Sequence, residues 1–101
     1  MRVIVFFDLP VQTAIERRNY SKFRKFLIKN GFLMMQESVY SKICLNGSQV
    51  ESCKRRLRSN KPPQGLVQIL VVTEKQYSNM VYLVGVSSHD TLDTDARVVV
   101  L

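Results

Sequence analysis

The chain has 101 residues, which is enough for one domain with a single hydrophobic core. Its hydrophobic fraction of 46% is typical of a globular protein and excludes a disordered tail. One histidine and two cysteines, Cys44 and Cys53, are too few for a four-ligand zinc site or a disulfide scaffold. The formal net charge of +7 favours a polyanionic partner, and nucleic acid is the first candidate.

No feature of the sequence directs the chain to a membrane. No apolar run approaches the roughly 20 residues that cross a bilayer, and the N-terminus enters a strand without the layout of a signal peptide. Reduced thiols are then the simplest state of the two cysteines. We therefore expect a cytoplasmic protein without a membrane partner.

The segment from Arg2 to Pro10, RVIVFFDLP, is the stretch around which the rest of the chain is organised. Its five apolar residues in a row predict a strand that is buried on both faces. Asp8 ends the apolar run and Pro10 stops the strand, because proline cannot donate to a sheet ladder. One interpretation is that Asp8 caps the turn that follows. The other is that Asp8 lies at the mouth of the sheet and binds a cation.

A helix is predicted from Ala14 to Asn30. Thr13 and Glu16 have the spacing of a capping box, and Gly31 follows as the C-cap. At 100° per residue, apolar side chains gather on one side and basic side chains fill an opposite arc of roughly 160°. The apolar side holds Ile15, Tyr20, Phe23, Phe26 and Leu27, and the basic side holds Arg17, Arg18, Lys22, Arg24, Lys25 and Lys29.

This basic face has two interpretations. A run of charges on a helix is usually only a solvated surface. From Glu16 to Lys29, however, there are six basic residues and one acidic residue, so the positive charge is hardly interrupted. We interpret the face as a phosphate-binding surface whose candidate residues are Arg17, Arg18, Lys22, Arg24 and Lys25.

Two short strands are predicted between residues 32 and 45, where the sequence is rich in β-formers. Glu37-Ser38 between them is a tight turn or a bulge, and one long bent strand is the alternative. After a turn at residues 46–47, Ser48 and Glu51 have the spacing of a second capping box. The helix that it opens runs to about Ser59. Its buried stripe is predicted to be Val50, Cys53 and Leu57, with Lys54, Arg55, Arg56 and Arg58 off the stripe.

The last third of the chain holds further strand-like segments. Residues 66–73 (LVQILVVT) form a strongly apolar strand, residues 73–76 start one helical turn, and residues 80–85 (MVYLVG) form a further short strand. Residues 86–95 are polar and acidic. The chain ends on a terminal strand, residues 97–101, that has little else to pack on.

The order of elements is β-α-β-β-α-β with extra strands, which predicts an α+β, ferredoxin-like sandwich. Two helices cover one face of an antiparallel sheet, and the other face stays apolar without cover in this chain. A second copy is the economical cover, so we expect a homodimer. Residues 1–85 are the expected core domain and residues 86–101 an arm. The arm's last strand is predicted to pair with the partner subunit through Arg97, Val98, Val99, Val100 and Leu101.

Several motifs occur together in a specific order. They are FFDLP at the end of the first strand, RR-x-Y and FRKFLIKNGF in and after the first helix, M-x-Q-x-SVY, PPQG before a strand, VTEKQ, and a strand that ends in VG. Together they resemble the CRISPR-associated protein 2 family, most closely its type II-A form, from residue 1 to about residue 85. Beyond residue 86 the likeness is loose.

The resemblance implies a ferredoxin-like fold and a tight homodimer whose C-terminal strands join the neighbour's sheet. It implies that the dimer bridges two dimers of the integrase, CRISPR-associated protein 1, and holds double-stranded prespacer DNA by its backbone during spacer acquisition. Some family members are described as magnesium-dependent nucleases that use the aspartate at the end of the first strand, which is Asp8 here. Met34 and Lys42 stand where those members have arginine, and this departure weighs against hydrolysis more than against DNA binding.

Four functions remain open at this point. The first is a non-catalytic DNA-bridging scaffold, and the second is an endonuclease for RNA or DNA that uses Mg²⁺ at Asp8. A single carboxylate without a histidine base supplies two-metal hydrolysis poorly, which favours the scaffold. An RNA-recognition domain shares the element order but lacks its K/R-G-F/Y string here. A small metabolic regulator does not account for the basic helices.

Overall fold

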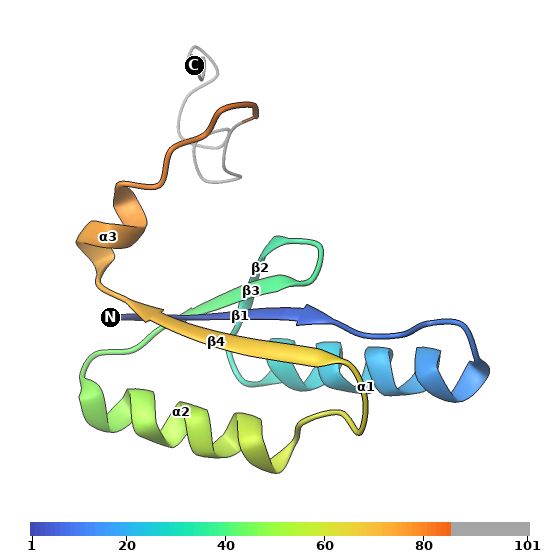
Figure 1. Ribbon diagram of the computed structural model, residues 1–101. Helices are drawn as coiled ribbons and strands as arrows, with labels where there is room; N and C mark the ends of the chain where they lie inside the picture. Colours follow the sequence, from blue (N-terminus) through green and yellow to red (C-terminus); the bar gives the residue numbers. More distant parts are fainter. Residues whose placement is uncertain (86–101) are drawn as a thin grey trace.

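The computed structural model describes residues 1–85 as a four-stranded antiparallel sheet with two long helices on one face (Figure 1). The strands lie in the order β2-β3-β1-β4. This is the order of a ferredoxin-like fold, so the predicted fold class is confirmed. The elements are β1 (Arg2–Asp8), α1 (Ala14–Lys29), β2 (Leu33–Gln36), β3 (Val39–Ile43), α2 (Gly47–Ser59), β4 (Leu66–Val72) and α3 (Glu74–Ser78).

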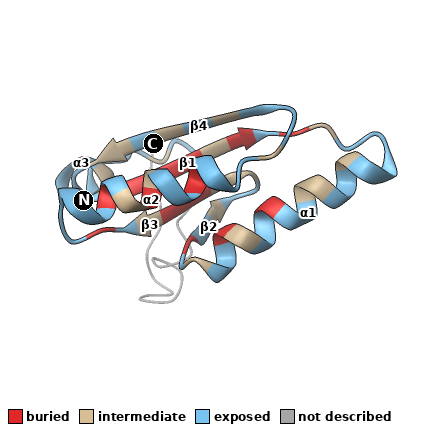
Figure 2. Cartoon of the chain, turned by 90° about the horizontal axis from the view of Figure 1, so that it is seen from below, coloured by how far each residue is buried: buried red, intermediate tan, exposed pale blue. Residues whose placement is uncertain are grey.

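The core lies between β1 and the two long helices. β1 pairs with both β3 and β4, so Val5 lies opposite Tyr40 on one side and Ile69 on the other. Figure 2 shows that the buried residues lie mainly on β1 and β3 and on the sides of α1 and α2 that face them. Phe7 packs against aromatic rings from α1 and β3, with centroids 5.3 Å from Phe23 and 5.7 Å from Tyr40. The buried stripe of α2 is Val50, Cys53 and Leu57, as predicted.

The first helix begins and ends close to its predicted limits. The Thr13 hydroxyl accepts from the Glu16 N–H, and the Glu16 carboxylate accepts from the Thr13 N–H, which forms the expected capping box. Asn30 is the C-cap and Gly31 follows with a positive φ of 88°. Ile15 does not join the core and is 66% exposed. The first turn of α1 extends beyond the end of the sheet, so there is no strand for Ile15 to pack on (Figure 1).

The region between α1 and α2 forms two short strands, β2 and β3, and the alternative of one bent strand is wrong. Residues 37 and 38 form the turn between them. Ser38 adopts a left-handed backbone with φ of 67°, and its carbonyl accepts from the Phe7 N–H. The turn therefore reaches back to the central strand.

The predicted start of the second helix is wrong by about two residues. The N-cap is Asn46, whose side chain accepts from the Gln49 N–H, and Gln49 in turn accepts from the Leu45 N–H. Ser48 and Glu51 lie inside α2 instead of capping it. The Cys44 N–H still donates to the Met1 carbonyl at the start of β1, and after Cys44 the chain leaves the sheet. Only Leu45 separates this last bond from the N-cap, Asn46.

The predicted strand at residues 80–85 does not form. β4 and the short helix α3 agree with the sequence, but no strand follows them up to residue 85. This segment runs away from the sheet on the side opposite α1 and α2, so no strand of residues 1–79 lies beside it to pair with (Figure 1). Val84 is 86% exposed there. The predicted terminal strand, residues 97–101, and the other predictions for residues 86–101 lie outside the described residues.

The second face of the sheet is largely open. Along it the strand register places Leu33, Ile43, Leu66 and Leu70, all of which are at least half exposed. Within residues 1–85, α3 lies on this side at the end of the sheet where β1 begins (Figure 1). No helix of this part of the chain is long and apolar enough to cross a bilayer.

Candidate functional site

The five basic residues predicted to bind phosphate all lie exposed on α1. Two of them are held by hydrogen bonds within the chain. The Arg17 guanidinium donates to the carbonyls of Val11 and Gln12 at 3.2 and 3.0 Å, and Arg24 Nε donates to the Tyr40 hydroxyl at 2.9 Å. This bond to Tyr40 raises the pKa of Arg24 above its ordinary value. The side chains of Arg18, Lys22 and Lys25 make no hydrogen bond or ion pair with any residue from 1 to 85, and their charge is available to a ligand.

The second helix extends this positive surface. α1 and α2 lie on the same face of the sheet, so their basic residues belong to one layer (Figure 2). Lys54 forms an ion pair with Glu51 at 3.3 Å, while Arg55 and Arg58 are exposed on α2. Glu16 is the only acidic residue of α1, and its carboxylate accepts hydrogen bonds from the backbone N–H groups of residues 12 and 13. The helical layer therefore has a strong excess of positive charge.

Asp8 lies exposed at the carboxyl end of β1, opposite Leu66 of β4. Behind it, Gly65 has a positive φ of 95°, and a Cβ at this position would lie 2.7 Å from the Asp8 carbonyl oxygen. Only glycine lets the loop approach β1 so closely. Asp8 borders a shallow depression of about 170 Å³, to which Ser38 and Gln68 add polar side chains. The basic residues predicted on α1 do not line this depression.

The residues around Asp8 fit a magnesium ion only in part. Magnesium commonly takes one or two carboxylates and keeps several waters, and Asp8 supplies one carboxylate. Within residues 1–85, no three histidine, cysteine, aspartate or glutamate side chains lie close enough together to hold a metal ion. Asp8 is therefore the only charged ligand that this part of the chain places at the depression. The catalytic and metal roles of Asp8 stay predictions.

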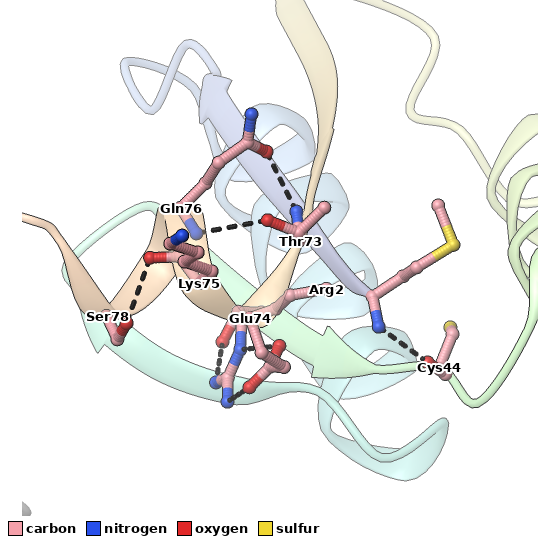
Figure 3. A network of polar contacts seen from close by, with 9 residues as sticks. Arg2, Cys44, Thr73, Glu74, Lys75, Gln76 and Ser78 are labelled. Atoms are coloured by element: carbon pink, nitrogen blue, oxygen red, sulfur yellow. Dashed lines mark hydrogen bonds and ion pairs between the residues drawn. The ribbon is translucent and has the colours of Figure 1, made fainter.

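A polar network around Arg2 was not foreseen from the sequence. Figure 3 shows the Arg2 guanidinium against the Glu74 carboxylate, with N–O distances of 2.8 and 3.0 Å. Arg2 also lies over the Tyr77 ring, 3.8 Å from its centroid. The bond to Arg2 lowers the pKa of Glu74, and the bond to Glu74 raises the pKa of Arg2. The network attaches α3 to the start of β1, two segments that lie far apart in the sequence.

Comparison with known proteins agrees with this fold and with the motifs. Residues 1–80 match the family model described as CRISPR associated protein Cas2. A protein of Treponema denticola named CRISPR-associated endoribonuclease Cas2 is 57% identical over 101 residues, which is the whole of both chains. A protein of Streptococcus mutans with the same name is 48% identical and covers 100% of this chain and 93% of its own, consistent with the type II-A-like resemblance.

A solved structure is similar in fold. The crystal structure of Streptococcus pyogenes Cas2 at pH 6.5 superposes with a TM-score of 0.61 at 18% identity. The match covers 82% of this chain and 99% of that one. With the family model, the relatives and the ferredoxin-like sheet in agreement, the chain belongs to the CRISPR associated protein Cas2 family.

Proposed function

We propose that this chain is an adaptation protein of a CRISPR system, a dimeric scaffold that holds prespacer DNA and bridges dimers of the integrase, CRISPR-associated protein 1. The observation that carries the proposal is the exposed positive layer on α1 and α2. Lysine and arginine side chains on helix surfaces contact phosphates, which contributes affinity without reading the base sequence. A protein that accepts spacers of any sequence needs this kind of contact.

The same proposal includes a homodimer. It is supported by the open sheet face with its exposed leucines and by exposed apolar side chains in residues 81–84. A two-fold pair would bury this patch on both subunits at once. Residues 1–85 would then form the core domain, and the arm at 86–101 would pair with the partner through residues 97–101. Light scattering on the full chain and on a chain that ends at residue 96 should show a weaker dimer for the shorter one.

The alternative is an endonuclease for RNA or DNA that depends on Mg²⁺ and acts through Asp8. It is favoured by one observation, which is that the close relatives are named endoribonucleases. Across a two-fold axis, two Asp8 carboxylates would repel each other unless a cation or a proton lay between them. Such a pair would complete the carboxylate set that one subunit lacks. For either function we expect a cytoplasmic location.

The deciding experiment compares purified wild type with Asp8→Ala for duplex binding and for cleavage of RNA and DNA, with and without magnesium. A scaffold binds DNA equally well in both forms and shows no cleavage that depends on Asp8. Asp8→Asn should then still support spacer integration with the integrase. If the wild type cleaves and Asp8→Ala does not, and Asp8→Asn abolishes integration while DNA binding persists, the endonuclease replaces the scaffold.

A further inference from the structure

A cavity of about 280 Å³ lies between the C-terminal turn of α1, the end of β3 and one side of α2. Its volume is close to the roughly 300 Å³ at which ordinary small-ligand pockets begin. The cavity does not include Asp8 or any of the five α1 residues proposed to contact DNA, and of the basic residues of α2 only Arg56 lines it. Its rim carries the exposed side chains of Gln49 and Arg56, so it opens to solvent.

Two cations face this cavity without an acidic partner. Lys42 from β3 and Arg56 from α2 both line it, and neither forms an ion pair with any residue from 1 to 85. Both are bonded to the C-cap of α1, because Lys42 Nζ donates to the Asn30 carbonyl at 2.8 Å and Arg56 Nη1 lies 3.5 Å from Asn30 Oδ1. The carbonyl end of a helix attracts cations, which accounts for the Lys42 bond, whereas Arg56 is bonded to a side-chain amide oxygen. Their remaining donors make no hydrogen bond to a residue from 1 to 85 and are placed to bind an anion.

The other walls combine aromatic and neutral polar groups. The rings of Phe26, on α1, and of Phe32, in the segment after α1, line the cavity. Ser52 and Gln49 from α2 add polar atoms. Burial, and then the neighbouring Cys44, raises the pKa of the Cys53 thiol, so it stays uncharged at neutral pH. Among residues 1–85, no aspartate or glutamate lines the cavity. An anionic ligand would therefore meet no like charge there.

We propose that this cavity binds one phosphorylated nucleotide, with the phosphate between Lys42 and Arg56 and the base against the phenylalanine rings. Paired cations provide charge-assisted bonds to phosphate, and an aromatic face accepts any base. The nucleotide comes either as a free mononucleotide or as the unpaired end of a DNA strand. This site is separate from the backbone contacts on α1 and does not depend on the scaffold function.

The test uses the full chain and three probes: deoxyadenosine 5′-monophosphate, a blunt duplex, and the same duplex with single-stranded ends. The mononucleotide is titrated to about 10 mM, which fills any site with a Kd near 1 mM. The variants are Arg56→Met and Lys42→Met. The matched control is Arg55→Met, which removes an exposed arginine next to Arg56 that does not line the cavity. Thermal unfolding checks that each variant folds, and Arg56→Met, at an exposed position, keeps the test valid if Lys42→Met does not.

Each cavity variant should weaken nucleotide binding about tenfold, the effect of one lost charge-assisted bond, while Arg55→Met leaves it unchanged. If the source is a free mononucleotide, only that titration changes. If it is a DNA end, the preference for the duplex with single-stranded ends over the blunt duplex falls in Arg56→Met and not in Arg55→Met.

The proposal is overturned if the mononucleotide does not bind and the cavity variants leave the preference for single-stranded ends unchanged. It is equally overturned if Arg55→Met has the same effects as Arg56→Met. The blunt duplex has no unpaired end and reports on the positive layer of α1 and α2. Its failure to bind wild type would reject the scaffold and leave the result for the cavity standing.

Discussion

Removing the three unbonded cations of α1 should reduce both the affinity for duplex DNA and its dependence on salt. The variant is Arg18→Ala, Lys22→Ala and Lys25→Ala in one chain. These side chains are exposed and make no ion pair with any residue from 1 to 85, so their loss leaves no buried group without a partner. Alanine is also the best helix former, so α1 itself should persist.

The size of the effect follows from counterion release. Each phosphate neutralised on a duplex contributes a slope of about −0.9 to the logarithm of affinity against the logarithm of salt concentration. A fourfold rise in salt therefore weakens binding about 3.5-fold per contact, and about 40-fold for three contacts. If all three residues contact phosphates, the slope of the variant should be less negative by about 2.7.

Fluorescence anisotropy on two duplexes of unrelated sequence, at several salt concentrations, measures these slopes. Lys75→Ala on α3 is the control, because Lys75 is exposed on a different side of the molecule and should leave the slope unchanged. A triple variant with the slope of the wild type would refute the assignment of α1 to the DNA backbone. Loss of one sequence and retention of the other would also count against it, because phosphate contacts do not distinguish bases.

Three further changes test the fold and the dimer. Gly65→Ala should lower the free energy of unfolding by about 2 kcal/mol or more in chemical unfolding, because alanine would have to adopt a left-handed backbone conformation with its Cβ 2.7 Å from the Asp8 carbonyl oxygen. Gly47→Ala is the control and should be nearly neutral, because the space around Gly47 is open. The bond to Arg2 lowers the pKa of Glu74 in the folded protein, so this ion pair stabilises the fold at pH values above the ordinary pKa of 4.5, and the stabilisation is lost as pH falls through the lower folded pKa. A melting temperature of wild type that stays above that of Glu74→Gln at pH 2 would contradict this. Leu70→Lys on the open sheet face should shift the mass in light scattering from dimer to monomer, while Leu45→Lys outside the sheet should not, and a variant that remains a dimer would exclude this face as the interface.

The sequence determined those features that depend on neighbours within a turn or two. The capping box at Thr13 and Glu16, the glycine after α1 and the apolar run of β1 are all local features of the sequence. The segregation of basic residues on α1 has the same origin, since the helical period alone places them opposite Phe23 and Leu27. The motif order was sufficient for the family resemblance, which is confirmed.

Predictions from local sequence were wrong where two segments had the spacing of a helix cap and where a strand needed a neighbouring strand. Asn46-Gln49 and Ser48-Glu51 both have the spacing of a helix cap, and the point at which β3 leaves the sheet decided for Asn46. Residues 80–85 have the composition of a strand, but a strand needs a neighbour for its backbone groups, and the fold of this segment provides none.

The character of the individual charges was decided only by the tertiary structure. Arg17 and Arg24 looked equivalent to Lys22 in the helical projection, yet the loop before α1 and the hydroxyl of Tyr40 hold the two arginines. In the same way, Lys42 and Arg56 lie 14 positions apart in the sequence and face one cavity because α2 covers the face of the sheet on which Lys42 lies. A charge has a defined role only once its neighbours are known, and these neighbours come from segments that no local pattern connects.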